Sequence, residues 1–161
     1  MDITLHPLSA NDKDTVLDIL TSRDVSKTYM LPDFENWEDA IPLCQRLMKM
    51  SKDENRFVRG IYAGEQCVGF MNDVEAEGGS IELGYVIHPE HWGKGFMTRG
   101  LKLAIGELFQ KGFDQVICGA FSQNTASQRV MEKAGMHLIE KSEDIAYRGK
   151  IHSCVYYAIE K

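Results

Sequence analysis

Apolar side chains recur at helical spacing in one stretch of the chain. Between residues 96 and 110 they fall on a single helical face, at Met97, Leu101, Ala104, Ile105, Leu108 and Phe109. The apolar run Ser80–Ile87 before this stretch predicts a short strand. Gly112 follows the last turn, where a glycine ends many helices. The pattern therefore predicts a strand, a turn and a long helix.

Shorter patterns predict the remaining elements. Further strands are expected at Ile3–Leu8, Arg56–Ala63, Gln66–Val74, Gln115–Phe121, His137–Tyr147 and Ile151–Ile159. Helices are expected over Asp14–Leu20, from a cap at Asn36 to about Met50, and from a cap at Asn124 to Gly135. Pro42 lies well inside the second helix, so we expect a bend there or a later start.

The order of these elements predicts the fold class. Turns at Gly64-Glu65 and Gly78-Gly79 favour an antiparallel meander of three strands. The order β-α-α-β-β-β-α-β-α-β-β lacks the alternation of a parallel sheet. It predicts an α+β fold, with a mixed, mostly antiparallel sheet of about six to seven strands and about four flanking helices. With 161 residues, the chain is expected to form one domain over residues 1–161.

Composition and charge narrow the function. Hydrophobic content of 43% and charged content of 26% are ordinary for a soluble protein, and a net charge of −6 argues against nucleic-acid binding. We find no run that predicts a membrane span and no signal-peptide pattern. The four scattered cysteines are expected to be reduced thiols of a cytoplasmic protein. His88 and His91 lack the glutamate of a zinc-protease motif, so no metal is expected.

The turn Pro89–Gly95 carries the first candidate chemistry. The first N–H groups of a helix have no internal partner, and glycines allow an anion to approach them closely. Gly93 and Gly95, with the N–H groups of Trp92, Lys94, Phe96 and Met97, form a candidate phosphate cradle. The alternative is that the glycines only turn the chain. The Gly-rich motifs of dinucleotide folds and P-loops are absent.

Glu82 is the second candidate. It alternates with Ile81 and Leu83, so its side chain faces away from theirs in a strand. An acid in an apolar strand needs a partner or a function. It can accept a proton from an amine if burial raises its pKa. A solvent-facing position or a structural ion pair is the alternative.

Two motifs carry a family resemblance over nearly the whole chain. Glu82-Leu83-Gly84-Tyr85 runs on through His88-Pro89-Glu90-His91-Trp92-Gly93-Lys94-Gly95-Phe96-Met97-Thr98. About thirty residues later, Asn124-x-x-Ser127 continues to Glu132-Lys133-x-Gly135-Met136. Together they resemble the GNAT superfamily of N-acetyltransferases, and most closely its ribosomal-protein N-terminal (alanine/serine) branch. The resemblance implies acetyl-CoA as cosubstrate, no metal, and a cleft between splayed central strands.

The resemblance also implies roles for individual residues. Main-chain groups of Val86 and Ile87 would bind pantetheine and polarise the thioester carbonyl, and Asn124 would add a hydrogen bond to its capping role. Glu82 would be the base. Ser127 would protonate the leaving thiolate or simply join the helix cap.

Two positions depart from the family pattern. Glu90 replaces a common Gln or Arg, and we expect it to point to solvent. Met131 replaces the tyrosine that often acts as general acid, which leaves that role unassigned. Tyr85 is expected in the core or the cleft wall. Arg99 and Arg129 could meet the 3′-phosphate of CoA, although a solvated helix face is the alternative.

The expected acceptor is the α-amine of a peptide or protein N-terminus. A small-molecule acceptor (a polyamine, aminoglycoside or amino acid) is one alternative, and a non-catalytic acyl-CoA sensor is another. The aromatic segment Tyr29–Trp37 either lines the acceptor side or packs a helix onto the sheet. No nucleic acid or membrane partner is expected, and the protein is expected to be a monomer or homodimer.

Overall fold

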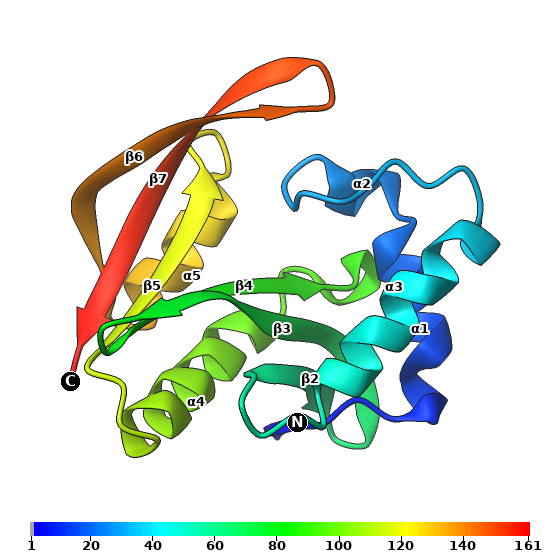
Figure 1. Ribbon diagram of the computed structural model, residues 1–161, viewed down its shortest axis with the longest axis horizontal. Coiled ribbons are helices and arrows are strands. Elements are labelled where there is room, and N and C mark those ends of the chain that lie inside the picture. Colours follow the sequence, from blue (N-terminus) through cyan, green and yellow to red (C-terminus); the bar gives the residue numbers. More distant parts are fainter. Residues whose placement is uncertain (1) are drawn as a thin grey trace.

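The computed structural model describes residues 2–161, in which seven strands form one sheet in the order β1-β2-β3-β4-β5-β7-β6 (Figure 1). Neighbouring strands are antiparallel except β4 and β5, which are parallel. The strands are β1 Ile3–His6, β2 Val58–Ala63, β3 Gln66–Glu77, β4 Ser80–Ile87, β5 Gln115–Phe121, β6 His137–Tyr147 and β7 Lys150–Glu160. The predicted fold class, a mixed and mostly antiparallel sheet, is confirmed.

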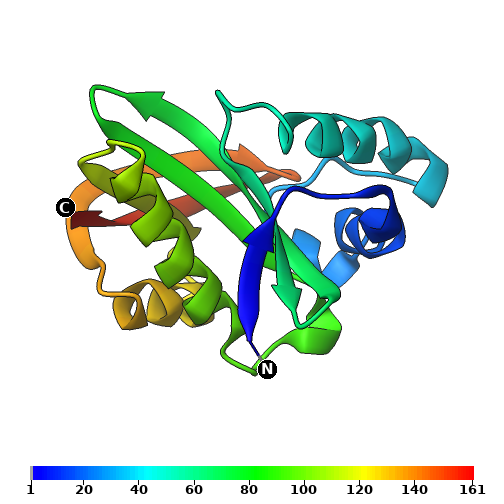
Figure 2. The ribbon, with the colours of Figure 1, turned by 90° about the horizontal axis from the view of Figure 1, so that it is seen from below.

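Helices cover both faces of the sheet (Figures 1 and 2). They are α1 Lys13–Leu20, α2 Arg23–Ser26, α3 Trp37–Met50, α4 Phe96–Gln110 and α5 Thr125–Lys133, with short 3-10 turns η1 Ala10–Asp12 and η2 Pro89–His91. One buried cluster joins α4 and α5 to the sheet, and a second joins α1 and α3 to the opposite face. Ile81, Leu83 and Ile87 of β4 belong to the first cluster and Val86 to the second, because side chains alternate along a strand.

The predicted meander is confirmed, and its turns show why it forms. Ala63 pairs with Gln66 around Gly64-Glu65, and Glu77 pairs with Ser80 around Gly78-Gly79. Gly64, Gly78 and Gly79 all have positive φ, which glycine adopts without a Cβ clash.

Several predicted boundaries were wrong. β1 ends at His6 and β2 begins at Val58, two residues inside each prediction, whereas β3 continues through exposed residues to Glu77. The extra helix α2 lies in the polar stretch after Leu20, where the Ser22 side chain accepts a hydrogen bond from the Val25 N–H. Polar sequence hides such a helix because a single turn has no apolar periodicity to detect.

The later helix start considered for Pro42 is also wrong. The helix α3 begins at Trp37, capped by Asn36, and runs through Pro42. Pro42 lacks the N–H that would pair with the Glu38 carbonyl. Both residues are exposed, so water can satisfy that carbonyl and the helix tolerates the missing bond.

The parallel strands β4 and β5 separate partway along their length. They pair only from Ser80 to Leu83 with Gln115 to Cys118. β4 then runs on to Ile87 and β5 to Phe121 without pairing to each other. The sheet therefore contains the splayed central strands that the family resemblance implied, and the site is built around this opening.

Candidate active site

The Gly93–Gly95 turn exposes the start of α4. Gly93 has φ 76° and Gly95 has φ 75°, and Gly95 is the residue that precedes the helix. A Cβ built on either glycine would meet open space, so the turn has room for a ligand beside the free N–H groups. Glu90 is exposed, as expected from its awkward charge.

The remaining cradle residues divide into an exposed and a buried set. Trp92 and Lys94 are exposed, whereas Phe96 and Met97 pack into the core beneath the turn. The Lys94 ammonium lies 5.9 Å from the centre of the Phe96 ring. The core therefore fixes the first helical turn, while the main chain before it stays open to solvent.

The end of β4 directs alternate main-chain groups into the opening. His88 N–H donates to the Val68 carbonyl across to β3 at 2.8 Å. Because adjacent residues of a strand point to opposite edges, the main-chain groups of Ile87 face the β5 side and those of Val86 face β3. The Ile87 carbonyl accepts a hydrogen bond from the Trp92 indole at 2.7 Å. Of the two predicted residues, Ile87 therefore places its main chain at the opening.

Glu82 lines a cavity of about 270 Å³ at the point where β4 and β5 separate. The other lining residues are Thr28, Tyr29, Met30, Asn72, Val74, Leu83, Gly84, Gly119, Ala120, Phe121, Ile145, Cys154 and Tyr156. A β-bulge at Val74 places Asp73 opposite Leu83 and Glu75 opposite Glu82. Bulges of this kind re-aim side chains beside functional sites.

Burial changes the acidity of Glu82. Its side chain is 18% exposed. Burial raises the pKa of Glu82, the Lys141 ammonium opposes that rise, and the carboxylates of Glu143 and Glu75 add to it. A carboxyl with a raised pKa is a stronger base once ionised, which suits proton transfer from an ammonium group.

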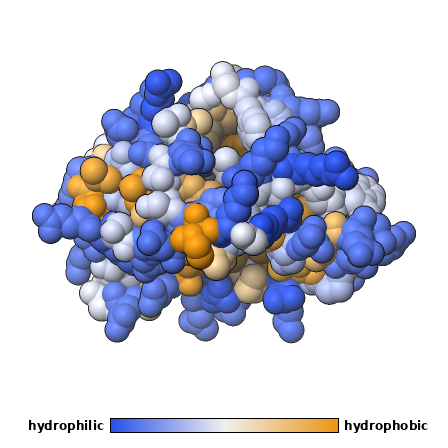
Figure 3. Space-filling model, turned by 90° about the horizontal axis from the view of Figure 1, so that it is seen from above, coloured by the Kyte–Doolittle hydropathy of each residue, from blue (hydrophilic) through white to orange (hydrophobic). Residues whose placement is uncertain are grey.

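A second cavity of about 450 Å³ borders the first. The two share Thr28 and Phe121, and the second is also lined by Lys27, Ser122, Gln123, Asn124, Ile151, His152 and Ser153. Together they form what we term the trough. Seen from above, the surface is hollowed, with hydrophobic residues at the base of the hollow and hydrophilic residues around it (Figure 3).

The tip of the β6–β7 hairpin is fastened to the segment between α2 and α3. The Tyr147 hydroxyl donates to the Ser26 carbonyl at 2.8 Å and accepts from the Leu31 N–H at 3.1 Å. Arg148 donates to the carbonyls of Leu31 and Pro32 at 3.3 and 3.2 Å. These bonds fix the segment that carries the trough residues Thr28 to Met30.

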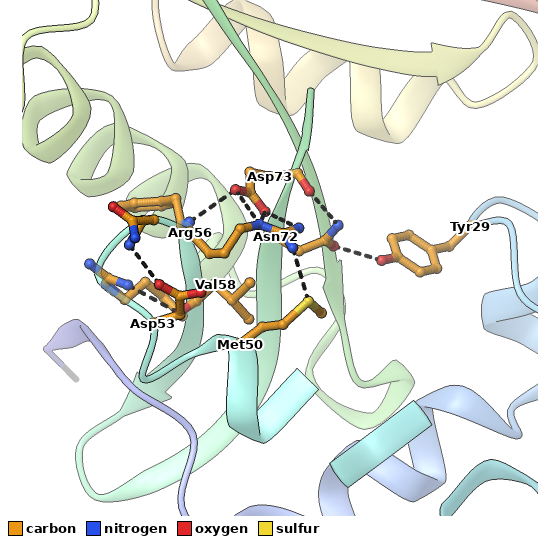
Figure 4. Close-up of polar contacts among 10 residues, drawn as sticks. Tyr29, Met50, Asp53, Arg56, Val58, Asn72 and Asp73 are labelled. Carbon is orange, nitrogen blue, oxygen red and sulfur yellow. Dashed lines mark hydrogen bonds and ion pairs between the residues drawn. The ribbon is translucent and has the colours of Figure 1, made fainter. Parts of the chain in front are cut away.

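The aromatic segment Tyr29–Trp37 partly lines the first cavity and partly packs into the core. Tyr29 and Met30 line the first cavity, whereas Leu31 is buried in the core and Trp37 is exposed. The Tyr29 hydroxyl donates to Asn72 Oδ1 at 2.9 Å (Figure 4). Burial raises the pKa of Tyr29 to about 12, so its phenol stays protonated near neutral pH.

Asn124 and Ser127 lie at the start of α5. Asn124 Oδ1 accepts from the Ser127 N–H at 3.1 Å, so the predicted cap is present. The Ser127 and Tyr85 hydroxyls are 2.6 Å apart, and either can be the donor. Burial raises the pKa of Tyr85 above its usual range. Met131, at the position of the usual tyrosine, is fully buried in the core.

The remaining candidate residues make other contacts. The His88 ring lies 3.6 Å from the Asp18 carboxylate. Within residues 2–161, no cluster of His, Cys, Asp and Glu is placed to hold a metal. Arg129 is exposed, and the Arg99 guanidinium lies over the Phe96 ring. All four cysteines are buried thiols. Over the same residues, no helix is long and apolar enough to cross a membrane.

Sequence reasoning missed most of the trough. Asn72, Gly119 and Tyr156 lie on three different strands, and no local motif links them. Gly119 carried the one usable signal, as a glycine inside a strand. A Cβ there would come within 2.6 Å of the Tyr156 ring, so the glycine makes room for that side chain.

An opening between β4 and β5 that a half-buried carboxylate lines, and an exposed turn before α4, are features that suit an acyl-CoA-dependent N-acyltransferase. Residues 2–137 match the model of the acetyltransferase (GNAT) domain, and the chain belongs to this family. It is therefore an acetyltransferase that uses acetyl-CoA. The superfamily resemblance is confirmed.

Relatives and solved structures agree on the fold. The chain is 24% identical over 139 residues to the uncharacterized N-acetyltransferase YoaA of Bacillus subtilis, covering 83% of this chain and 78% of YoaA. It superposes with a TM-score of 0.84 on the RimL ribosomal L7/L12 alpha-N-protein acetyltransferase in complex with coenzyme A, at 14% identity over 98% of this chain and 93% of that one. The Vibrio cholerae spermidine N-acetyltransferase, in complex with CoA and spermine, gives 0.82 at 18% identity over 98% and 95% of the two chains.

Proposed function

We propose that this acetyltransferase transfers the acetyl group of acetyl-CoA to the α-amine of a peptide or protein N-terminus. The observation that carries the proposal is the position of Glu82. Its half-buried carboxyl lines a cavity where β4 and β5 separate, and the Gly93–Gly95 turn follows the far end of β4. Acetyl donor and amine would thus approach the opening from two sides.

The cofactor would be held mainly by the main chain. We assign its pyrophosphate to the turn formed by Gly93 and Gly95 and the N–H groups around them, from Trp92 to Met97. The main chain of Ile87, with Val86 beside it, would bind pantetheine, and the Ile87 N–H would polarise the thioester carbonyl. The amide nitrogen of Asn124 is available for a further bond, because its oxygen is engaged in the helix cap.

Glu82 would prepare the acceptor for attack. The ammonium group of the acceptor gives one proton to the carboxylate, directly or through water, and the neutral nitrogen attacks the acetyl carbon. As the new C–N bond forms, the C–S bond breaks and the thiolate leaves, and the nitrogen releases its second proton to water to give the neutral amide. Ser127, supported by the Tyr85 hydroxyl at 2.6 Å, would donate a proton to that thiolate. Much of the rate would come from holding the two reactants together.

The shape of the trough favours an extended acceptor. The cavity at Glu82 and the larger second cavity share Thr28 and Phe121 as lining residues, so the two lie side by side. An N-terminal amine at Glu82 would leave the following residues of a peptide in the second cavity. An α-amine, with a pKa of about 7.7–8.0 against about 10.4 for lysine, also needs less help from a carboxylate near neutral pH.

A polyamine is the second candidate acceptor. Glu75 lies opposite Glu82 across β3 and β4, and Glu143 also acts on the Glu82 carboxyl. Two further carboxylates close to the one that lines the cavity suit a substrate with more than one positive charge. The neighbour in complex with spermine shows that the fold accommodates such a ligand.

The experiment is thiol release combined with mass spectrometry. The substrates are a peptide with a free N-terminus and an internal lysine, the same peptide with its N-terminus blocked, and spermidine. We expect acetylation of the N-terminal amine and little turnover of the blocked peptide. Acetylation confined to the lysine would overturn the proposal. Turnover of spermidine alone would indicate that the acceptor is a polyamine, the second candidate.

A further inference from the structure

Lys141 places an ammonium group directly against the proposed base. Its Nζ lies 3.8 Å from Glu82 Oε1 and 4.5 Å from the centre of the Tyr156 ring. A carboxylate on one side and an aromatic face on the other form an environment that binds ammonium groups. Both of these partners also line the cavity at the strand opening. An acceptor ammonium that enters this cavity therefore meets the two groups that Lys141 already contacts.

An irregularity in β6 brings Lys141 to this position. Leu138 pairs with Tyr157 and Ser142 pairs with Val155. Three residues of β6, at positions 139 to 141, thus lie opposite the single residue Tyr156. Extra residues of this kind bend a strand and re-aim its side chains. A second irregularity, at Val74 in β3, lies on the other side of Glu82. The cavity is flanked by two such features.

The charges around Glu82 make Lys141 the cation that balances it. The pKa of the Glu82 carboxyl is affected by Glu75 from β3 and by Lys141 and Glu143 from β6. Glu82 in turn helps to raise the pKa values of the neighbouring Cys118, Cys154 and Tyr156 on β5 and β7. Of the three fully charged neighbours only Lys141 is positive. Tyr156 is neutral near pH 7, because burial raises the pKa of its phenol, and its hydroxyl donates to Glu143 at 2.8 Å.

The Lys141 contact is built to be exchanged. The Lys141 side chain is 39% exposed, whereas the Glu82 side chain is 18% exposed. A half-exposed lysine can turn into water and remain solvated, but the carboxylate stays in the cavity. The lysine end of this pair is partly exposed and the charged atoms are 3.8 Å apart, so Lys141 can exchange Glu82 for water at modest cost.

We propose that Lys141 occupies the position of the acceptor ammonium and is displaced by it, which makes Lys141 a specificity-determining residue of the acceptor site. This inference rests on the proposed function, because it requires Glu82 to receive the acceptor amine. An acceptor that arrives as an ammonium ion can replace Lys141 at Glu82. The nitrogen of the amide product carries no charge and cannot form an ion pair with Glu82. The return of Lys141 to Glu82 therefore assists product release.

The test compares Lys141→Met, Lys141→Arg and a matched surface control, Lys102→Met on the exposed face of α4. KM and kcat for the peptide with a free N-terminal α-amine are measured as a function of pH. Lys141→Met removes the competitor, so KM for the amine should fall about three- to fivefold. The acidic limb of kcat/KM should move to higher pH, because Lys141 lowers the pKa of Glu82 and the base must be ionised. Lys141→Arg should behave like the wild type, and so should Lys102→Met.

A double variant separates this inference from the proposed function. In a Glu82→Gln background, Lys141→Met should change KM much less than in the wild type, because the shared carboxylate is gone and only the Tyr156 ring remains. An unchanged or raised KM in the single Lys141→Met variant, or an unmoved pH profile, would overturn the displacement of Lys141. If Glu82→Gln itself has wild-type kinetics, the proposed function fails as well, which is a distinguishable result.

Discussion

The two ends of the site are built in different ways. The cradle end, Gly93 to Met97, is one continuous segment that presents main-chain N–H groups above a buried helix start. The trough instead collects side chains from the α2–α3 segment and from strands β3 to β7. A ligand held by main-chain N–H groups constrains only the few positions where a side chain would block its approach. A ligand held by side chains depends on residues that are far apart in the sequence, each of which can change without loss of the fold.

The largest effect is expected at Glu82, the proposed general base, which lines the trough. Glu82→Gln keeps the shape of the side chain but cannot accept the proton, so kcat/KM at neutral pH should fall about 10²-fold or more. Steady-state thiol release measures this change. Glu65→Gln, an exposed acid in the β2–β3 turn, is the control and should leave the rate unaltered. An equal rate for Glu82→Gln and wild type would make Glu82 a structural residue.

The next effect concerns the cradle. Gly95→Asp adds a side chain and a negative charge where we place the pyrophosphate, so CoA affinity should fall at least about tenfold, or about 1.4 kcal/mol. Gly64→Asp is a matched control, because Gly64 also has positive φ and open space around it but lies in a distant turn. Calorimetric titration with CoA compares the two variants. Equal affinities would contradict the assignment of the cradle.

A smaller effect is expected at the hairpin tip. Tyr147→Phe removes the hydroxyl that joins the hairpin to the Ser26 carbonyl and the Leu31 N–H. The wall carrying Thr28 to Met30 should loosen, and KM for a peptide acceptor should rise about three- to tenfold, as expected for one or two lost hydrogen bonds. CoA affinity should not change. If KM is unaltered while the variant remains folded, the hairpin does not shape the trough.

The smallest effect is expected at Ser127. A thiolate is a tolerable leaving group without help, so Ser127→Ala should lower kcat only about two- to fivefold. Tyr85→Phe should have a similar effect, since the two hydroxyls are hydrogen-bonded. The measurement is kcat at saturating amine and acetyl-CoA. A wild-type kcat in both variants would leave Ser127 with its capping role alone.

The same contrast explains what the sequence could predict. Strand β4, the Gly-x-Gly turn and helix α4 follow one another in the sequence, so their apolar periodicity and their motif predict them without a structure. The family resemblance added the splayed strands, which the pairing of β4 with β5 confirms.

The trough could not be predicted in this way, because its walls depend on sheet order and on two irregular pairings. Nothing near Glu82 in the sequence indicates that Lys141, 59 positions later in a different strand, would lie beside it. The irregular stretch of β6 that brings it there has no sequence signature. The hairpin tip at Tyr147 contacts residues more than a hundred positions earlier for the same reason.

The central claim is that Glu82 removes a proton from the acceptor amine. The most direct test is the ratio of wild-type to Glu82→Gln kcat/KM, measured from about pH 6 to about pH 9 with an α-amine peptide. The ratio should be largest near neutral pH and should shrink as pH rises through the amine pKa of about 7.7–8.0, because free amine then becomes abundant without a base. A ratio that stays constant across this range would contradict the account.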